Sequence, residues 1–119
     1  MKQIPLYDET VPISCTAGEA EIADRIELIE RMHGWQTRIE RGEHGLLLHF
    51  PYDPGVEAEI RRFTADEKAC CSFWGFAVDV TDDEVLLRWD APPALEEYVA
   101  RLQAYFEGDE PLSAVSGLL

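Results

Sequence analysis

Basic side chains are scarce in this chain of 119 residues, which has 10 Lys and Arg against 24 Asp and Glu and a formal net charge of -14. A chain this acidic repels phosphate backbones and anionic membrane surfaces, so we expect no binding to nucleic acid or to membranes. No apolar run approaches the roughly 20 residues that a membrane-spanning helix needs. The opening residues, MKQIPLYDETVPIS, lack the apolar stretch of a signal peptide, so the expected location is the cytoplasm.

Cysteine is also scarce, with three residues, and an odd number argues against a framework of disulfides. The sequence contains no glycine-rich phosphate loop, no nucleophile elbow and no CxxC pair. Few motifs that point to a particular chemistry are therefore present. The side chains that remain informative are Cys15 and the adjacent Cys70 and Cys71.

Three segments carry apolar side chains at helical spacing, namely 16–34, 53–70 and 92–108. The first opens with a capping box led by Thr16 and is expected to stop at Gly34. The second has an Asp-Pro start, and the third begins at a pair of prolines.

Two further segments, 35–50 and 74–89, alternate apolar and polar side chains with a period of two and are each interrupted by a turn. Each therefore predicts a β-hairpin. The side chains expected on the inner face include Trp35 and Ile39 in the first hairpin. In the second they are Trp74, Phe76, Val78, Val80, Val85, Leu87 and Trp89.

The predicted architecture is α+β, in the order helix, hairpin, helix, hairpin, helix. A four-stranded antiparallel sheet would have the helices packed on one face. We expect an N-terminal arm at 1–13, a single domain at 14–108 and a flexible tail at 109–119. The outer face of the sheet would mix apolar and cationic side chains: Leu47, Gly75, Ala77, Leu86, Arg38, His49 and Arg88. Such a face is either ordinary exposed surface or the contact of a homodimer.

A carboxylate lies on the apolar stripe of the second helix. At 100° per residue the stripe consists of Val56, Ile60, Phe63, Glu67 and Cys70. Burying the Glu67 carboxylate is costly unless it is paired, protonated or coordinated, and such a conflict is typical of functional sites. The alternative is that Glu67 lies at the rim and pairs with a basic residue of its own helix, which would be Arg61, Arg62 or Lys68.

The three thiols differ in their expected acidity. Cys70 and Cys71 lie at a helix end, where the dipole disfavours thiolates, whereas Cys15 precedes a helix start, where it favours them. If all three converge, a bound cation would resolve the charge conflict, and thiolates select Cu(I), Zn(II), Hg(II) or trivalent arsenic. The helix would have to end at Cys70 for both adjacent side chains to face inward. The alternative is that the cysteines are small buried core residues.

Residues 67–73, Glu-Lys-Ala-Cys-Cys-Ser-Phe, resemble the E-x-x-C-C-x-F motif of a family of small bacterial proteins. Ile13-Ser14-Cys15-Thr16 resembles that family's cysteine-led first helix, and Ala91-Pro92-Pro93 resembles the start of its last helix. The resemblance covers roughly residues 11–107, and Ser72 stands where members often have Pro or Ala. Some members are encoded near heavy-metal resistance and metalloregulator genes, so the resemblance implies the handling of thiophilic metals.

We therefore expect a cytoplasmic protein that binds a soft metal or metalloid ion of the Hg, Cu, Zn or As class. The expected site is Cys15, Cys70 and Cys71, with Glu67 beside them or as acceptor of a proton. One alternative is a thiol redox enzyme in which Cys15 attacks and Cys70 or Cys71 resolves. Another is an interaction module that dimerises through the outer face of the sheet and has only structural cysteines.

Overall fold

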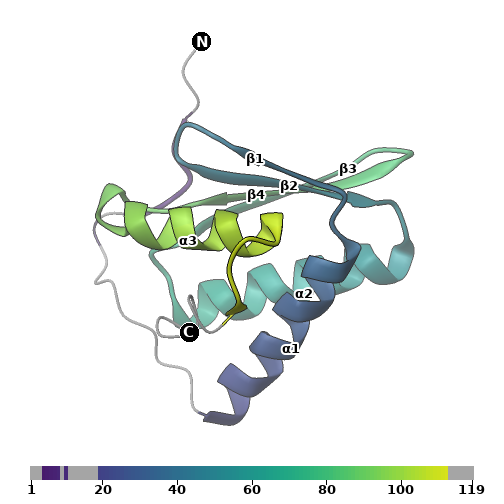
Figure 1. Cartoon of the computed structure of the whole chain (residues 1–119), viewed down its shortest axis with the longest axis horizontal. Helices are drawn as coiled ribbons and strands as arrows, with labels where there is room; N and C mark the ends of the chain where they lie inside the picture. Colours follow the sequence, from purple (N-terminus) through teal and green to yellow (C-terminus); the bar gives the residue numbers. More distant parts are fainter. Residues whose placement is uncertain (1–3, 9, 11–18, 113–119) are drawn as a thin grey trace.

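The computed structural model describes residues 4–8, 10 and 19–112, without the side chains of residues 19–22 and 70. Within this part, the chain forms three α-helices, four strands and one 3-10 turn (Figure 1). Their order is α1 (Glu19–Trp35), β1 (Arg38–Arg41), β2 (Gly45–Pro51), α2 (Pro54–Cys70), β3 (Gly75–Val80), β4 (Glu84–Asp90), η1 (Pro93–Leu95) and α3 (Glu96–Glu107).

The four strands form one antiparallel sheet in the order β1-β2-β4-β3, and α1, α2 and α3 lie on the same side of it in Figure 1. The α+β class, the four-stranded antiparallel sheet and the three helices are thus confirmed. The simple alternation of helix and hairpin is incomplete, because η1 precedes α3. The pairing of β2 with β4, which puts Leu48 opposite Leu87, makes a continuous sheet from the two hairpins.

The core fills the space between the sheet and the helices. Strands β2 and β4 point six side chains into it that are at most 1% exposed: Leu46, Leu48, Phe50, Val85, Leu87 and Trp89. Full burial of such a side chain contributes about 1.5–3 kcal/mol. From α2 the core receives Ile60 and Phe63, both fully buried.

The ends of α2 and α3 follow from local chemistry. The Asp53 carboxylate accepts hydrogen bonds from the backbone N–H groups of Gly55 and Val56, at 2.8 and 3.3 Å, and Pro54 is the first helical residue. Helix α3 ends at Gly108, whose φ of 90° is a left-handed conformation that favours glycine. Both helix ends are as the sequence predicts.

Two expectations about the first half of the sheet and its edge are wrong. Helix α1 does not stop at Gly34 but continues to Trp35, because the N–H of Gln36 still bonds to the carbonyl of Met32 at 2.9 Å. Trp35 is therefore helical, and β1 begins only at Arg38. Val80 is 39% exposed rather than buried, since it is the last residue of an edge strand.

The described part of the N-terminal arm packs against the sheet. The N–H of Leu6 donates to Oδ2 of the buried Asp90 at 3.0 Å, and the N–H of Asp8 donates to the Phe73 carbonyl at 3.1 Å. Arg88 holds the Asp90 carboxylate through two hydrogen bonds, at 2.7 and 3.2 Å. The expected helix cap Thr16 lies outside the described residues.

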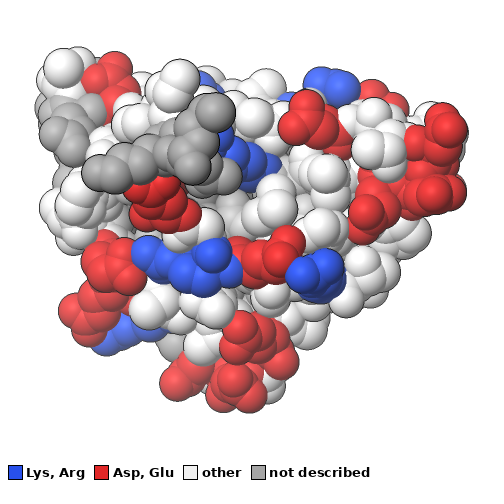
Figure 2. Space-filling model, turned by 90° about the horizontal axis from the view of Figure 1, so that it is seen from above, with Lys and Arg blue, Asp and Glu red and all other residues white. Residues whose placement is uncertain are grey.

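The predicted C-terminal tail begins with a core contact, because Leu112 packs against the core cluster. Residues 113–119 lie outside the described part. Figure 2 shows the acidic side chains in several groups over one face of the molecule, with a few basic side chains among them. Among the described helices, none combines the length and apolar character required to cross a bilayer.

Candidate thiol and carboxylate site

Glu67 is fully buried, at 0% exposure, on the face of α2 that packs into the core. It continues the stripe of Ile60 and Phe63, as its helical position predicts. The alternative of a rim position is wrong, because the three basic residues of α2 have other partners. Arg61 pairs with Glu57, Arg62 with Asp24 and Glu59, and Lys68 with backbone carbonyls.

The partner of Glu67 is Arg25 of α1, which is 5% exposed. Its Nη1 lies 3.4 Å from Oε1 of Glu67, so the pair joins α1 to α2 inside the molecule. Sequence reasoning missed Arg25, because it assigned the inward stripe of residues 16–34 to their apolar side chains. The stripe that is buried contains Leu28, Ile29 and Met32, and Arg25 precedes them by three, four and seven residues.

Cys71 follows α2 and turns the chain out of the helix. Its backbone, with φ -123° and ψ 72°, is not helical, and its N–H donates to the Glu67 carbonyl at 2.7 Å. The residue is 1% exposed. Helix α2 thus ends at Cys70. An end at this residue is what the sequence analysis required if the two adjacent cysteine side chains are both to face inward.

The environment of Glu67 favours a proton. Burial raises the pKa of Glu67 above its ordinary value, and the Arg25 guanidinium, the Cys71 thiol and the Trp74 side chain oppose that rise. Neither carboxylate oxygen receives a well-aligned hydrogen bond from the described residues. The buried carboxylate therefore has one cation at moderate distance and a thiol beside it, an arrangement that can accept a proton from the thiol.

The four residues predicted for a metal site are only partly placed. The structure brings Glu67 and Cys71 together, whereas Cys15 and the side chain of Cys70 lie outside the described part. Among the described side chains, no three of the His, Cys, Asp and Glu type are grouped closely enough to hold a metal ion.

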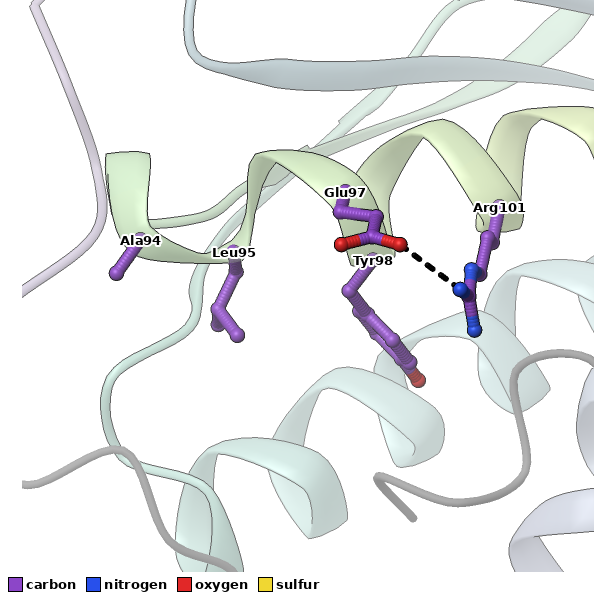
Figure 3. A pocket seen from close by; sticks show the side chains of 5 residues that line it. All are labelled: Ala94, Leu95, Glu97, Tyr98 and Arg101. Carbon is purple, nitrogen blue, oxygen red and sulfur yellow. Dashed lines mark hydrogen bonds and ion pairs between the residues drawn. The ribbon is translucent and has the colours of Figure 1, made fainter.

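An aromatic cluster separates the site from a surface hollow of about 240 Å³ beneath α3. Trp74, whose side chain contacts Glu67, stacks on Tyr98 with ring centroids 5.7 Å apart. Figure 3 shows Tyr98 pointing from α3 into this hollow, which Ala94, Leu95, Glu97 and Arg101 also line. The hollow is thus one stacked pair of rings away from Glu67.

Fold and site together define a small α+β protein with a buried arginine–carboxylate–thiol cluster between two helices. Comparison of the chain with protein-family models, with curated proteins and with solved structures finds no match.

Proposed function

We propose that this protein binds a soft metal or metalloid ion of the Hg, Cu, Zn or As class through cysteine thiolates, in a reducing compartment such as the cytoplasm. Cys15, Cys70 and Cys71 are the proposed ligands, and Glu67 is the proposed acceptor of a thiol proton. The observation that carries this proposal is the fully buried Glu67 carboxylate beside the Cys71 thiol. The resemblance of residues 67–73 to the E-x-x-C-C-x-F family is in line with it.

A thiol must lose its proton before it binds a soft ion, and the buried carboxylate gives that proton a destination. The S–H bond of Cys71 breaks, a sulfur–metal bond forms, and the proton moves to Glu67. The carboxylate becomes a neutral acid, and the negative charge passes from the partner of Arg25 to the Cys71 sulfur, where it binds the ion. Because burial already raises the pKa of Glu67, protonation of this group is favoured inside the molecule.

The chain on both sides of Cys15 is anchored near the site. Asp8, seven residues before it, bonds to the Phe73 carbonyl at 3.1 Å, and Arg25, ten residues after it, pairs with Glu67 at 3.4 Å. Seven residues reach at most about 25 Å when extended. The end of α2 is therefore within reach of Cys15 by chain length, which supports its inclusion among the ligands.

The proposal is tested by titrating the reduced protein with Hg(II), Cu(I), Zn(II) and arsenite. We expect stoichiometric binding of at least one of them, and we expect Cys71→Ser to weaken it by at least about a hundredfold, because one sulfur bond is lost. Binding that survives replacement of both Cys70 and Cys71 by Ser would contradict the proposal. So would the absence of binding by all four ions.

The role of Glu67 has its own readout, the number of protons released to the buffer per ion bound. Glu67→Gln removes the acceptor, so we expect about one more proton to reach the buffer than in the parent protein. Glu57→Gln is the matched control, because it changes a carboxylate of the same helix that lies outside the core and pairs with Arg61. Equal proton release by all three proteins would exclude Glu67 as the acceptor.

A second candidate function is self-association through the outer face of the sheet. Leu47, Ala77 and Leu86 lie on that face and are only half-buried, which favours a contact with a second copy. Sedimentation should then detect a dimer that Leu86→Glu dissociates. A monomer in both the parent protein and the variant would exclude this function.

A further inference from the structure

Every backbone carbonyl of residues 71–74, the segment that carries the chain from α2 to β3, accepts a hydrogen bond. The Cys71 carbonyl accepts from the N–H of Trp74 at 3.1 Å, and the Phe73 carbonyl accepts from the N–H of Asp8 at the same distance. The carbonyls of Ser72 and Trp74 both accept from Nζ of Lys68. A segment that lies outside helix and strand is therefore held at each of its four carbonyl groups.

Lys68 makes the contacts that close this turn. It lies in the last turn of α2, so its ammonium also meets the negative end of the helix dipole. Its side chain is exposed to solvent along part of its length, yet its head group bridges two carbonyls on either side of Phe73. The Lys68 ammonium thus links the end of α2 to Ser72 and Trp74, the residues on either side of Phe73.

The N-terminal arm provides the remaining contact. Asp8 bonds to Phe73, and the preceding Leu6 crosses β3 so closely that a Cβ on Gly75 would lie 2.1 Å from the Leu6 carbonyl carbon. Hydrogen bonds from Thr10 are the main cause of the lowered pKa of Asp8, and the positive charge of Lys68 contributes to it. Arm and ammonium are therefore close enough to act on the same segment.

We infer that Lys68 and the backbone of Asp8 form a latch that holds residues 71–74 closed and thereby controls access to the Cys71 thiol. The thiol is 1% exposed, so a reagent or an ion reaches it only when the surrounding structure opens locally. Opening of this segment breaks the two bonds to Lys68 and the bond to Asp8. The biological role of the latch rests on the proposed function, because the latch covers a proposed ligand. Its effect on the accessibility of the Cys71 thiol is measured without any ion.

The experiment measures the rate at which iodoacetamide alkylates Cys71 in the folded protein, in a background of Cys15→Ser and Cys70→Ser. Lys68→Met is expected to raise this rate by about ten- to a hundredfold, because hydrogen bonds to a charged group contribute to the closed state. Lys68→Arg keeps charge and donors and should restore most of the protection. Arg61→Met is the matched control, because Arg61 is a basic residue of the same helix that bonds to Glu57 and should leave the rate unchanged.

A second variant acts on the arm. Gly75→Ala places a methyl group where the Leu6 backbone passes, so it should displace the arm from Phe73 and speed alkylation in the same direction. Urea unfolding of each variant gives the rate expected from global unfolding, and the latch predicts a rate above it. If neither Lys68→Met nor Gly75→Ala exceeds that rate, the latch is overturned.

The outcomes for latch and function are separable. If Lys68→Met speeds alkylation while the parent protein binds none of the four ions, the proposed function fails and the latch stands. If ions bind through the cysteines but neither Lys68→Met nor Gly75→Ala is alkylated faster than global unfolding allows, the latch fails and the function stands.

Discussion

At the scale of single residues, the buried pair of Arg25 and Glu67 carries a cost in desolvation. Removing two ions from water costs several kcal/mol each, and an attraction at 3.4 Å returns that cost only in part. Apolar side chains of similar size would fill the same space without a desolvation penalty. The pair is thus weak as a source of stability, which is consistent with a chemical role for Glu67.

A double-mutant cycle tests the energetics of this pair. Arg25→Met alone leaves a buried carboxylate without its cation, and we expect it to lower the free energy of unfolding by about 3–5 kcal/mol. Arg25→Met combined with Glu67→Leu should recover most of that loss, because no charge then remains buried. Urea unfolding at neutral pH measures these two variants and the second single variant, Glu67→Leu. A double variant as unstable as the sum of the two single variants would show that the pair is not coupled.

The raised pKa of Glu67 has a consequence for the dependence of stability on pH. The folded protein holds this proton more tightly than the unfolded chain does, so the group's contribution to stability is complete below the unfolded pKa of about 4.3. It is lost as the pH rises through the folded value. We therefore expect the stability of the parent protein, relative to Arg25→Met with Glu67→Leu, to decrease as the pH rises above about 4.3. A relative stability that increases over this range would contradict the sign of the shift.

At the scale of the elements, a partly buried group of three side chains joins three strands on the outer face of the sheet. We call this group the clamp. Nε2 of His49 lies 2.8 Å from Glu40, and Nδ1 lies 3.0 Å from Glu84, so the ring of a β2 residue bridges β1 and β4. The hydrogen bond from His49 is the main cause of the lowered pKa of Glu40. Strand β2 already pairs through its backbone with β1 on one side and with β4 on the other. The clamp adds side-chain contacts between the same three strands.

Removing the imidazole should therefore raise the pKa of Glu40. A lowered carboxylate pKa contributes stability above the unfolded pKa, and that stability is lost as the pH falls through the folded value. In His49→Gln, an NMR titration of the Glu40 carboxyl carbon should give a pKa closer to the ordinary value. Arg38→Gln is the control and should have a smaller effect, because Arg38 is a lesser cause of the shift. An unchanged Glu40 pKa in His49→Gln would contradict the assignment.

The elements also show where local pattern is sufficient. The cap at Asp53, the stop at Gly108 and the alternating strands are set by neighbouring residues, so they are predictable from the sequence. The end of α1 is not predictable in this way. Gly34 permits the helix to end but does not require it, and the hydrogen bond from the N–H of Gln36 to the Met32 carbonyl extends the helix to Trp35.

At the scale of the whole molecule, the net charge of -14 is a source of repulsion within the folded chain. Raising the salt concentration from about 0.01 to 0.15 M shortens the screening length from about 30 to 8 Å. We expect the unfolding temperature, measured by differential scanning calorimetry, to rise over this range. Sucrose at matched osmolality is a control for uncharged solute effects. A fall in the unfolding temperature with salt would mean that the surface ion pairs outweigh the repulsion.

Some parts of the candidate site follow from local sequence patterns, and others depend on contacts between distant parts of the chain. The position of Glu67 on the inner face of α2 follows from helical spacing, and the end of the helix at Cys70 agrees with the requirement that two adjacent thiols impose. Arg25 and the arm at Asp8 reach the site from 42 and 59 residues away in the chain, counted to Glu67, and no local pattern specifies such contacts.

The sequence by itself determined the α+β class, the antiparallel hairpins, the caps of the later helices and the presence of a carboxylate on an apolar stripe. These features depend on side-chain period and on backbone groups within a few residues of each other. Only the tertiary structure decided that Arg25 pairs with Glu67, that β2 lies against β4, and that Lys68 and Asp8 hold the segment after α2. Each of these contacts joins parts of the chain that come together only when the complete core packs. The core is enclosed by all of the helices and strands together, so no single element determines which residues meet.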